Sequence, residues 1–385
     1  MEDTPQIAQM QTYLFPFLAS AIFLLLHLIV YRGLFYQLSN LKIIRNFLKL
    51  FTFLNFCGTV AYMFLRQFPL VPQWLYLLIS ISIGVVFSLF VSTIIYQFLN
   101  IFIHFITSKN KRTAYRNYLQ RIVIVLSMIY IGYGIYNGES NPILKKISIP
   151  LANLSSPLKI VQLSDTHIGG LIEESRVKKM VELVNDQDPD LIVLTGDIVD
   201  TKLKNVLKAV DELKNLKATY GVYYVLGNHE YLHDIYNIIQ KMKDLGFHVL
   251  INQNSLISKN GIPLINIAGN ADLMGNRMGY LQPNIDKTFE GIQSNIPTIL
   301  LSHQPKIIEK IKDKPVDIIL SGHTHGGQIF PFSLAVLLQQ PFLMGLHKIE
   351  NDRFLYINQG TGFWGPPMRV GSHSEITLIN LFPKP

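Results

Sequence analysis

Five short polar motifs, each directly after a run of apolar residues, constrain this chain more than any other feature. The motifs are Asp165-Thr-His167, Gly196-Asp197, Gly227-Asn228-His229-Glu230, Ser302-His303 and Gly322-His323-Thr324-His325. The runs before them are Lys159–Leu163, Asp190–Leu194, Val222–Leu226, Thr298–Leu301 and Asp317–Leu320. Short apolar runs closed by turn residues are typical of buried strands. The pattern predicts an α/β domain whose sheet carries Asp, Asn and His side chains along one edge, where open α/β sheets bind ligands.

The residue types at these strand ends suit a pair of divalent cations. Carboxylate, amide and imidazole donors with one shared carboxylate can hold two ions about 3.5–4 Å apart, the spacing used for phosphoryl displacement. The i, i+2 spacing of Asp165 and His167 lets a strand end or tight loop aim both side chains at one point. His323 and His325 repeat that spacing. No thiolate accompanies these donors, which favours manganese, iron, zinc or cobalt over a closed structural zinc site.

Taken together, the motifs resemble those of the calcineurin-like metallophosphoesterase superfamily. The family pattern is D-x-H, G-D, G-N-H-[DE], H and G-H-x-H, and every element is present in order over roughly residues 155–382. The intervals between motifs are similar to those of small bacterial members. The resemblance implies two facing mixed sheets with helices outside, and a hydrolase acting on phosphoester or pyrophosphate bonds.

The resemblance also implies roles for individual residues. The first metal would be held by Asp165, His167, Asp197 and His325, and the second by Asp197, Asn228, His303 and His323. A hydroxide between the two ions would attack phosphorus in line, and His229 would protonate the leaving oxygen or stabilise charge on the phosphoryl group. The expected cofactors are two divalent ions, manganese first, with iron, zinc or cobalt as alternatives. Glu230 and Asp200 are expected to orient ligating imidazoles.

Four further residues are candidate substrate contacts. Asn270 and Asp272 follow another apolar run, and either line the pocket or form a buried turn. Trp364 and Arg369 lie in a Gly- and Pro-rich segment that resembles the loop after the final strand of membrane-linked family members. Arg369 would contact phosphate or form a surface ion pair. The remaining histidines are expected in helices, on the surface or in the core, and they are His27, His104, His233, His248, His347 and His373.

Residues 1–138 differ in composition from the rest of the chain. Apolar stretches near 13–31, 47–65, 74–106 and 119–136 predict a transmembrane region of about four helices. The fourth stretch is short and contains Gly132 and Gly134, which makes its crossing the weakest part of this prediction. Residues 139–157 are expected to form a linker with a first strand at Ile147–Leu151. Residues 158–385 are expected to form the metallophosphoesterase domain.

Charge divides along the same boundary. Residues 1–146 contain 12 Lys and Arg against 3 Asp and Glu, whereas the remainder has 22 against 23. The catalytic region therefore has no basic excess, and nothing favours nucleic acid as a partner. The basic residues follow the first and third stretches, and positive loops stay in the cytoplasm. This predicts a catalytic domain on the extracytoplasmic side of a bacterial inner membrane, or in the cytoplasm if the fourth stretch does not cross.

The membrane region favours a phosphorylated substrate that is lipid-linked or part of the cell envelope. If the catalytic domain is cytoplasmic, the resemblance extends to UDP-2,3-diacylglucosamine pyrophosphatases of lipid A synthesis. The competing class is a non-catalytic membrane sensor or transporter that uses the domain to bind a ligand. The near absence of charge within the predicted spans argues against an ion pathway.

Four other segments carry helical or apolar patterns. Glu173–Asn185, Leu203–Leu216 and Asp234–Leu245 predict amphipathic helices between the motif strands. Ile329–Leu346, directly after the last motif, contains no Lys, Arg, Asp or Glu. It is expected to be either a flap that dips into the bilayer beside the active site or a buried helix that completes the core.

Overall fold

The computed structural model describes residues 6–36, 38, 42–66, 71–106, 108–350 and 353–384, with the backbone alone for residues 6–13. Residues 1–5 of the predicted transmembrane region and residue 385 of the predicted metallophosphoesterase domain lie outside the described residues. The chain forms two compact units. The helical unit consists of residues up to Glu139 together with Gly365–Val370, and the catalytic unit consists of Ser140–Trp364 and the residues from Gly371 onward.

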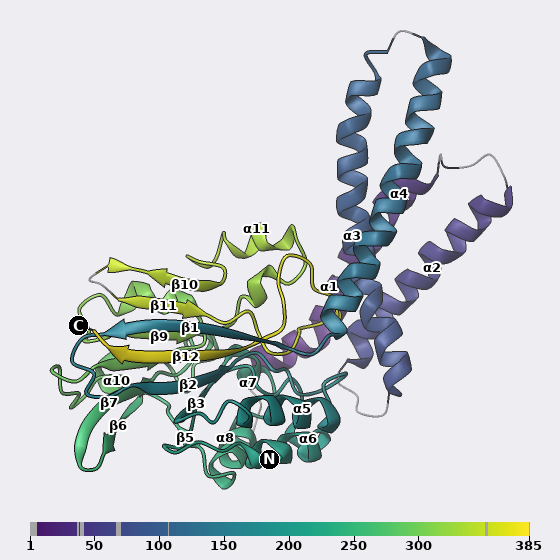
Figure 1. The fold of residues 1–385 in the computed structure, drawn as a ribbon. Coiled ribbons are helices and arrows are strands. Elements are labelled where there is room, and N and C mark those ends of the chain that lie inside the picture. Colours follow the sequence, from purple (N-terminus) through teal and green to yellow (C-terminus); the bar gives the residue numbers. More distant parts are fainter. Residues whose placement is uncertain are drawn as a thin grey trace. The chain divides into compact units, whose positions relative to one another are not determined.

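The helical unit contains four long helices (Figure 1). They are α1 (Gln6–Val30), which continues into the π-helical turn η1 (Tyr31–Phe35), α2 (Lys42–Leu65), α3 (Gln73–Ile103) and α4 (Lys109–Glu139). All four are long and apolar enough to cross a membrane. The fourth has 31 residues, longer than the apolar stretch predicted there, because the basic residues before that stretch are helical as well. Large apolar side chains such as Phe47 and Phe98 are more than half exposed, as contact with lipid requires.

Glycines of α3 and α4 make room for the segment Gly365–Val370 within the helical unit. A Cβ atom on Gly84 would lie 2.2 Å from Met368 Sδ, and one on Gly134 would lie 3.2 Å from Met368 Cε. The backbone N–H of Arg369 donates to the carbonyl of Gly134 at 2.9 Å. Close approach of this kind is the usual reason for small residues in membrane helices.

The catalytic unit is built on two six-stranded mixed sheets (Figure 1). The first has the order β1 (Ile143–Leu151), β12 (Glu375–Pro383), β2 (Leu158–Leu163), β3 (Leu191–Thr195), β4 (Val222–Val225) and β5 (His248–Val249). The second has the order β10 (Gly345–Lys348), β11 (Phe354–Ile357), β9 (Ile318–Ser321), β8 (Thr298–Leu301), β7 (Ile262–Gly269) and β6 (Gln253–Lys259). Their inner faces share one apolar core, which includes Ile160 and Val193 from the first sheet and Ile267 and Leu320 from the second.

The two-sheet arrangement confirms the fold that the resemblance implied. The simpler expectation of one sheet carrying all five motifs is wrong, because β2, β3 and β4 belong to the first sheet and β8 and β9 to the second. The first strand begins at Ile143, earlier than predicted, because it pairs in parallel with β12 over its whole length from Ile143 to Leu151.

Short helices cover the sheets and connect the strands. α5 (Glu174–Asn185) and α8 (Ile235–Asp244) confirm two predicted helices, and with α6 (Leu207–Asp211) they lie on the outer side of the first sheet (Figure 1). The single helix predicted over Leu203–Leu216 is wrong. Val206 leaves the helical region at φ −130° and ψ 17°, which divides the segment into the 3-10 turn η2 (Leu203–Asn205), α6 and the 3-10 turn η3 (Glu212–Asn215). The remaining helices are α7 (Asn228–Leu232), α9 (Met274–Met278), α10 (Ile285–Thr288), α11 (Phe332–Val336), η4 (Pro305–Lys310) and η5 (His325–Gly327).

Candidate metal centre

The five motifs lie where β2, β3, β4, β8 and β9 end, and most of their polar residues have an unusual backbone. Asp165, His167, Asp197, His323 and His325 all have φ between 48° and 72°. Residues other than glycine rarely adopt this left-handed conformation, and they keep it where the surrounding structure enforces it. β2, β3 and β9 therefore end in sharp turns that direct carboxylates and imidazoles toward the neighbouring strand ends.

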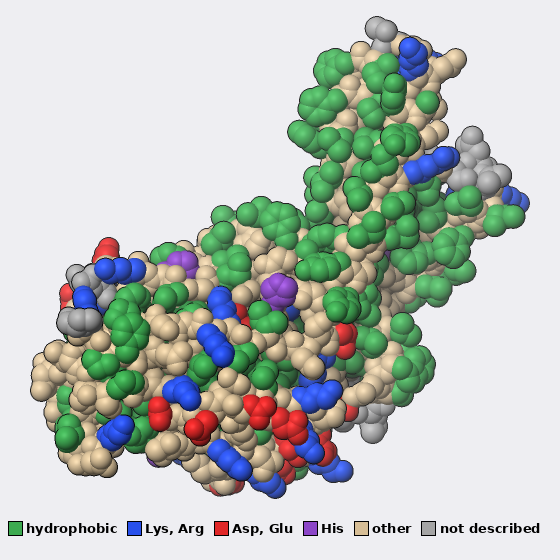
Figure 2. All heavy atoms as spheres, in the orientation of Figure 1, with side chains coloured by type: hydrophobic (Ala, Val, Ile, Leu, Met, Phe, Trp, Pro, Cys, Tyr) green, Lys and Arg blue, Asp and Glu red, His purple; other side chains and the backbone are tan. Residues whose placement is uncertain are grey.

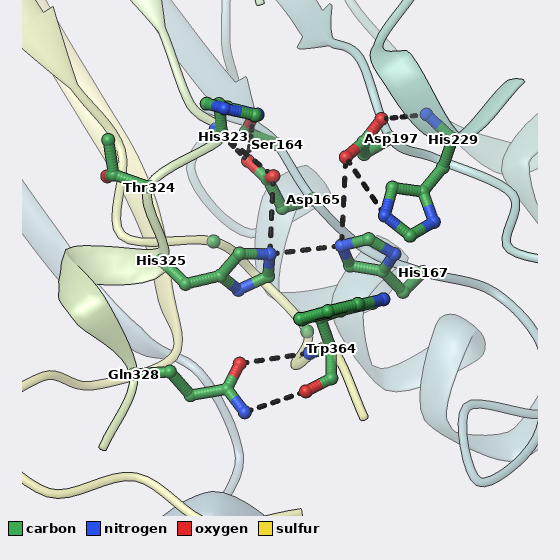
Figure 3. A network of polar contacts seen from close by, with 12 residues as sticks. Ser164, Asp165, His167, Asp197, His229, His323, Thr324, His325, Gln328 and Trp364 are labelled. Carbon is green, nitrogen blue, oxygen red and sulfur yellow. Dashed lines mark hydrogen bonds and ion pairs between the residues drawn. The ribbon is translucent and has the colours of Figure 1, made fainter. Parts of the chain in front are cut away.

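One group of donors gathers around His167 and His325 (Figure 3). The Nε2 atoms of these two residues are 3.0 Å apart, and His325 Nε2 is 3.4 Å from Asp165 Oδ1. His167 Nε2 is also 4.0 Å from Asp197 Oδ2. All four side chains are buried. Two buried imidazole nitrogens facing two carboxylates are the donor set that a divalent transition-metal ion prefers, so this group could hold one cation.

A second group shares Asp197 with the first. His303 Nε2 is 3.1 Å from Asp197 Oδ2, 3.1 Å from Asn228 Oδ1 and 3.3 Å from His323 Nδ1. Burial opposes a charge on Asp197, but His303 and His229 outweigh it and hold the pKa of this carboxyl well below its usual range. A carboxylate that stays ionised between two sets of nitrogen donors could bridge two cations.

The backbone around these donors fixes their orientation. His303 directs Nδ1 to the carbonyl of Thr195 at 2.8 Å, which leaves Nε2 for the donor group. The backbone N–H of His323 donates to Asp165 Oδ2 at 2.9 Å. Gly322 allows that approach, because a Cβ atom there would lie 2.1 Å from the same oxygen.

Glu230 holds two of the motif loops together. Its fully buried carboxylate accepts hydrogen bonds from the backbone N–H groups of Asp197, Ile198, Val199 and Gly227, at 2.7–3.2 Å. The expectation that Glu230 orients an imidazole is therefore wrong. The carboxylate occupies the turn after β3 instead and fixes it against the start of α7.

His229 is oriented by two carboxylates. Its backbone N–H donates to Asp197 Oδ1 at 2.8 Å, and its Nδ1 atom is hydrogen-bonded to Asp200 Oδ1. Its Nε2 atom is 3.9 Å from Asp197 Oδ2. Burial alone would lower the pKa of His229, but Asp200 and Asp197 outweigh it and raise the pKa to about 9. Asp200 was expected to orient ligating imidazoles, and this geometry fits that expectation. The second carboxylate oxygen of Asp200 is 3.8 Å from His167 Nδ1.

His233 belongs to the same neighbourhood, although the sequence analysis set it apart. Its Nε2 atom is 3.4 Å from Asp200 Oδ1, the oxygen that also binds His229. The spacing of four residues between His229 and His233 is a weak signal in the sequence, since it would place both on one face of a helix. In the structure α7 ends at Leu232, and His233 follows it with a non-helical backbone at φ −124° and ψ −120°. The motif pattern hid this relation because it ends at Glu230.

The four expected substrate contacts have different surroundings. Asn270 and Asp272 are almost fully buried at the end of β7, where Asp272 Oδ1 accepts hydrogen bonds from Met274 N–H and Gln304 Nε2. Burial, above all, raises the pKa of Asp272 to about 6. Trp364 is 43% exposed, and its ring centroid is 5.9 Å from that of His229.

The side chain of Gln328 bonds both the N–H and the carbonyl of Trp364, at 3.0 and 2.8 Å (Figure 3). Arg369 belongs to the helical unit and its side chain is fully buried, so the surface ion pair considered for it is wrong. Its expected contact with phosphate stays a prediction.

The fold and the paired donor groups define a class, the metal-dependent phosphoesterases, and comparison with known proteins identifies the family. Residues 158–327 match the family model of the calcineurin-like phosphoesterases. The chain is 33% identical to an uncharacterized metallophosphoesterase of Campylobacter jejuni, over 96% of this chain and 98% of that protein. A second uncharacterized metallophosphoesterase, from Helicobacter pylori, is 35% identical over 90% of this chain and 95% of that protein.

A transmembrane protein with a metallophosphoesterase domain from Bos taurus is 36% identical over 71% of this chain and 64% of that protein. The chain therefore belongs to the calcineurin-like metallophosphoesterase family. As a member, it is a phosphoesterase of a family that uses two divalent metal ions.

Proposed function

We propose that the chain is a membrane-anchored hydrolase of phosphoester or pyrophosphate bonds whose two cations share Asp197. The observation that carries this proposal is the position of Asp197 Oδ2, 3.1 Å from His303 Nε2 and 4.0 Å from His167 Nε2. Asp165, His167 and His325 complete the first site, and Asn228, His303 and His323 complete the second. The donor set suits manganese, iron, zinc or cobalt, with manganese as our first choice.

Once bound, the two ions supply Lewis-acid stabilisation of the charge on the phosphoryl group. The residues around them position the substrate and move a proton. His229 is held by Asp200 through Nδ1, so Nε2 faces the donor groups and can give a proton to the leaving oxygen. The carboxylates of Asp200 and Asp197 raise the pKa of His229 against the effect of its burial, and this favours the protonated imidazole that a proton donor requires.

The bridging role of Asp197 is tested by Asp197→Ala in the full chain. We expect loss of bound metal and of bis-p-nitrophenyl phosphate hydrolysis, because both cations lose a ligand. Asp211→Ala is the control, since Asp211 pairs with Lys241 on the surface and lies outside the site. Wild-type turnover by Asp197→Ala would disprove the assignment.

The role of His229 gives a different result. His229→Ala should keep both catalytic ions, because His229 is not among the seven ligands proposed for them, yet lose roughly 100- to 10,000-fold in turnover, the usual contribution of a general acid or base. Metal content by mass spectrometry and turnover on the same diester separate the two roles. Full activity in His229→Ala would refute the proton-donor role.

We also propose that the substrate carries a lipid, because an exposed apolar surface adjoins the site. This surface, the α11 patch, consists of Phe330, Phe332, Leu334, Leu337 and Leu338, which are 47–87% exposed. Figure 2 shows apolar side chains gathered over α11. The patch begins two residues after Gln328, whose side chain fixes Trp364. The alternative of a buried core helix over Ile329–Leu346 is wrong, and contact of the patch with lipid stays a prediction.

Changing Leu337 and Leu338 to Glu tests the α11 patch. Both side chains are exposed, so the fold should tolerate the charges, and turnover of bis-p-nitrophenyl phosphate should stay near that of wild type. Turnover of a lipid phosphate presented in vesicles should fall, because charged residues do not enter the apolar layer. Ile262→Glu is the control, since Ile262 is 61% exposed on the β6–β7 hairpin. Unchanged lipid turnover in the double variant would exclude the patch as a lipid contact.

The side of the membrane decides which lipid is available. We propose an extracytoplasmic catalytic unit in a bacterial inner membrane, because α4 is long enough to cross and the basic residues follow the first and third helices. Reporter fusions within Gly138–Asn141 test this location. A cytoplasmic reporter signal would contradict it and would favour UDP-2,3-diacylglucosamine as substrate.

A further inference from the structure

A third cluster of metal-binding side chains lies beside the two donor groups that share Asp197. It consists of Asp200, His229 and His233, whose donor atoms all lie within 4.8 Å of one another. Asp200 Oδ1 is the common partner of His229 Nδ1 and of His233 Nε2. The three side chains are 27%, 13% and 11% exposed, in that order, so solvent reaches the cluster.

The backbone fixes the three residues with respect to one another. His229 and His233 belong to the sequence His229-Glu-Tyr-Leu-His233, which has the H-E-x-x-H spacing of zinc-binding motifs. Here His233 follows the end of α7 with a non-helical backbone, at φ −124° and ψ −120°, and its Nε2 atom meets the oxygen of Asp200 that also binds His229. Asp200 follows the bridge between Val199 and Ile168, and its N–H donates to the carbonyl of Ile168 at 3.1 Å. Glu230 fastens α7 to the backbone of Asp197–Val199.

The same contacts of Glu230 exclude the usual chemistry of that motif. In zinc proteases the glutamate acts as a general base. Here its carboxylate is fully buried and occupied by four backbone N–H groups, so it cannot activate a water molecule. The spacing therefore offers cation binding without the protease reaction.

We propose that Asp200, His229 and His233 form a third, zinc-type cation site next to the dinuclear centre. Two imidazoles and one carboxylate are a known three-ligand set for zinc, and solvent exposure leaves an open fourth position. No residue of this set belongs to the seven ligands proposed for the two catalytic ions.

Occupation of this site inhibits the enzyme, a consequence that rests on the proposed role of His229. A cation on His229 Nδ1 takes the place of the hydrogen bond to Asp200 that holds the ring as a proton donor. The ring then has no proton to give to the leaving oxygen without becoming an anion. Excess zinc is therefore a switch that turns hydrolysis off while the catalytic ions stay bound.

Metal stoichiometry tests the site without reference to activity. The full chain in detergent is dialysed against excess Zn²⁺, and zinc per chain is measured by mass spectrometry for wild type, His233→Ala and His233→Gln. Gln keeps a hydrogen-bond donor to Asp200 but is a poor zinc ligand, so it separates cation binding from a purely structural role of His233. We expect both variants to bind one zinc fewer than wild type. Equal stoichiometry in all three proteins would overturn the proposal, whatever the state of the catalytic centre.

Zinc inhibition tests the consequence. Turnover of bis-p-nitrophenyl phosphate by the manganese-loaded protein is followed as Zn²⁺ is added. We expect the half-inhibiting zinc concentration to rise by roughly tenfold or more in His233→Gln, as loss of a metal partner costs at least that much affinity. His248→Ala is the matched control, because His248 is an exposed histidine stacked on Tyr223 outside the cluster. Identical inhibition of wild type and His233→Gln would refute the switch.

Discussion

Buried hydroxyls of the helical unit and buried carboxylates of the catalytic unit find their hydrogen-bond partners at different distances along the chain. In α3, the hydroxyls of Ser82, Ser88 and Thr93 donate to carbonyls four residues earlier in the same helix, at 2.7–3.1 Å. In the catalytic unit, buried carboxylates join segments that are distant in the sequence. Glu375, for example, accepts from Tyr356 Oη and from Gln359 Nε2, both at 2.8 Å.

The contrast follows from the two solvents. A helix in lipid has no water to satisfy a stray hydroxyl, so the nearest carbonyl of the same helix is the safest partner. An aqueous domain can bury an ionised carboxylate when several N–H groups converge on it. We therefore expect polar substitutions to have large effects in the catalytic unit and small effects in the helices.

Removal of Glu230 should have the largest effect. Glu230→Ala leaves four backbone N–H groups without their acceptor, and each buried unsatisfied group costs about 1–3 kcal/mol. We expect the free energy of unfolding of the catalytic unit to fall by more than about 3 kcal/mol, measured by denaturant unfolding. A wild-type unfolding midpoint for Glu230→Ala would contradict the role of this carboxylate as the connection between the two loops.

Gly322→Ala should affect activity more than stability. The added Cβ atom would lie 2.1 Å from Asp165 Oδ2, so this carboxylate must move. A shift of about 1 Å in a catalytic group costs roughly 100-fold in turnover. Diester hydrolysis at saturating manganese measures the loss. Gly132→Ala, at a helical glycine with open space around it, controls for the added methyl group. Retained turnover in Gly322→Ala would show that Asp165 tolerates displacement.

Asn55→Ala tests an exception among the helices. Asn55 Nδ2 donates to the carbonyl of Ser82 at 3.0 Å and is 3.0 Å from His27 Nε2, so it joins three helices. Hydrogen bonds between membrane helices contribute about 0.6 kcal/mol on average, with a maximum near 1.7. We expect a loss of that size in unfolding of the full chain in detergent, with unchanged diester turnover. Cys57→Ala, an exposed residue on the same helix, should change neither quantity.

Ser88→Ala should have the smallest effect. Its hydroxyl donates only to the carbonyl of Gly84, which keeps its own helical hydrogen bond when the hydroxyl is removed. We expect a change within about 0.5 kcal/mol in the same unfolding measurement. If Ser88→Ala lowered the free energy of unfolding more than Asn55→Ala does, local hydrogen bonds would stabilise the helices more than interhelical ones, contrary to this expectation.

The chemistry of the site was predictable from the sequence because it depends on residue type and order. The apolar runs before Asp165, Asp197 and His303 mark the strands correctly, and the donor types indicate the cations. The left-handed turns and the position of Glu230 could not be predicted, because they depend on N–H groups brought together by the fold. His233 was missed because its spacing from His229 is only a weak signal and its partner Asp200 is 33 residues away in the chain.

Prediction of helices from apolar periodicity failed where local hydrogen bonds and backbone turns interrupted the helix. The apolar spacing of Leu203–Leu216 fits one helix, but the side chain of Asn205 donates to Thr201 Oγ1 and Val206 leaves the helical region. The apolar run Ile329–Leu346 left two interpretations open because periodicity cannot distinguish a buried surface from an exposed one. Exposure of the α11 patch contradicts the buried helix, and the flap in the bilayer stays a prediction.

The order β1-β12-β2 in the first sheet has a consequence for synthesis on the ribosome. β1 ends at Leu151 and β2 begins at Leu158, yet the strand that lies between them is not made until residues 375–383. A nascent chain thus carries two unpaired strand edges while more than half of the protein is still being translated. Exposed edges of this kind favour aggregation. Because the helices come first in the chain, they are made long before the catalytic unit can close. The edges of β1 and β2 therefore need protection during elongation, a need that is no longer visible once β12 has paired with both strands.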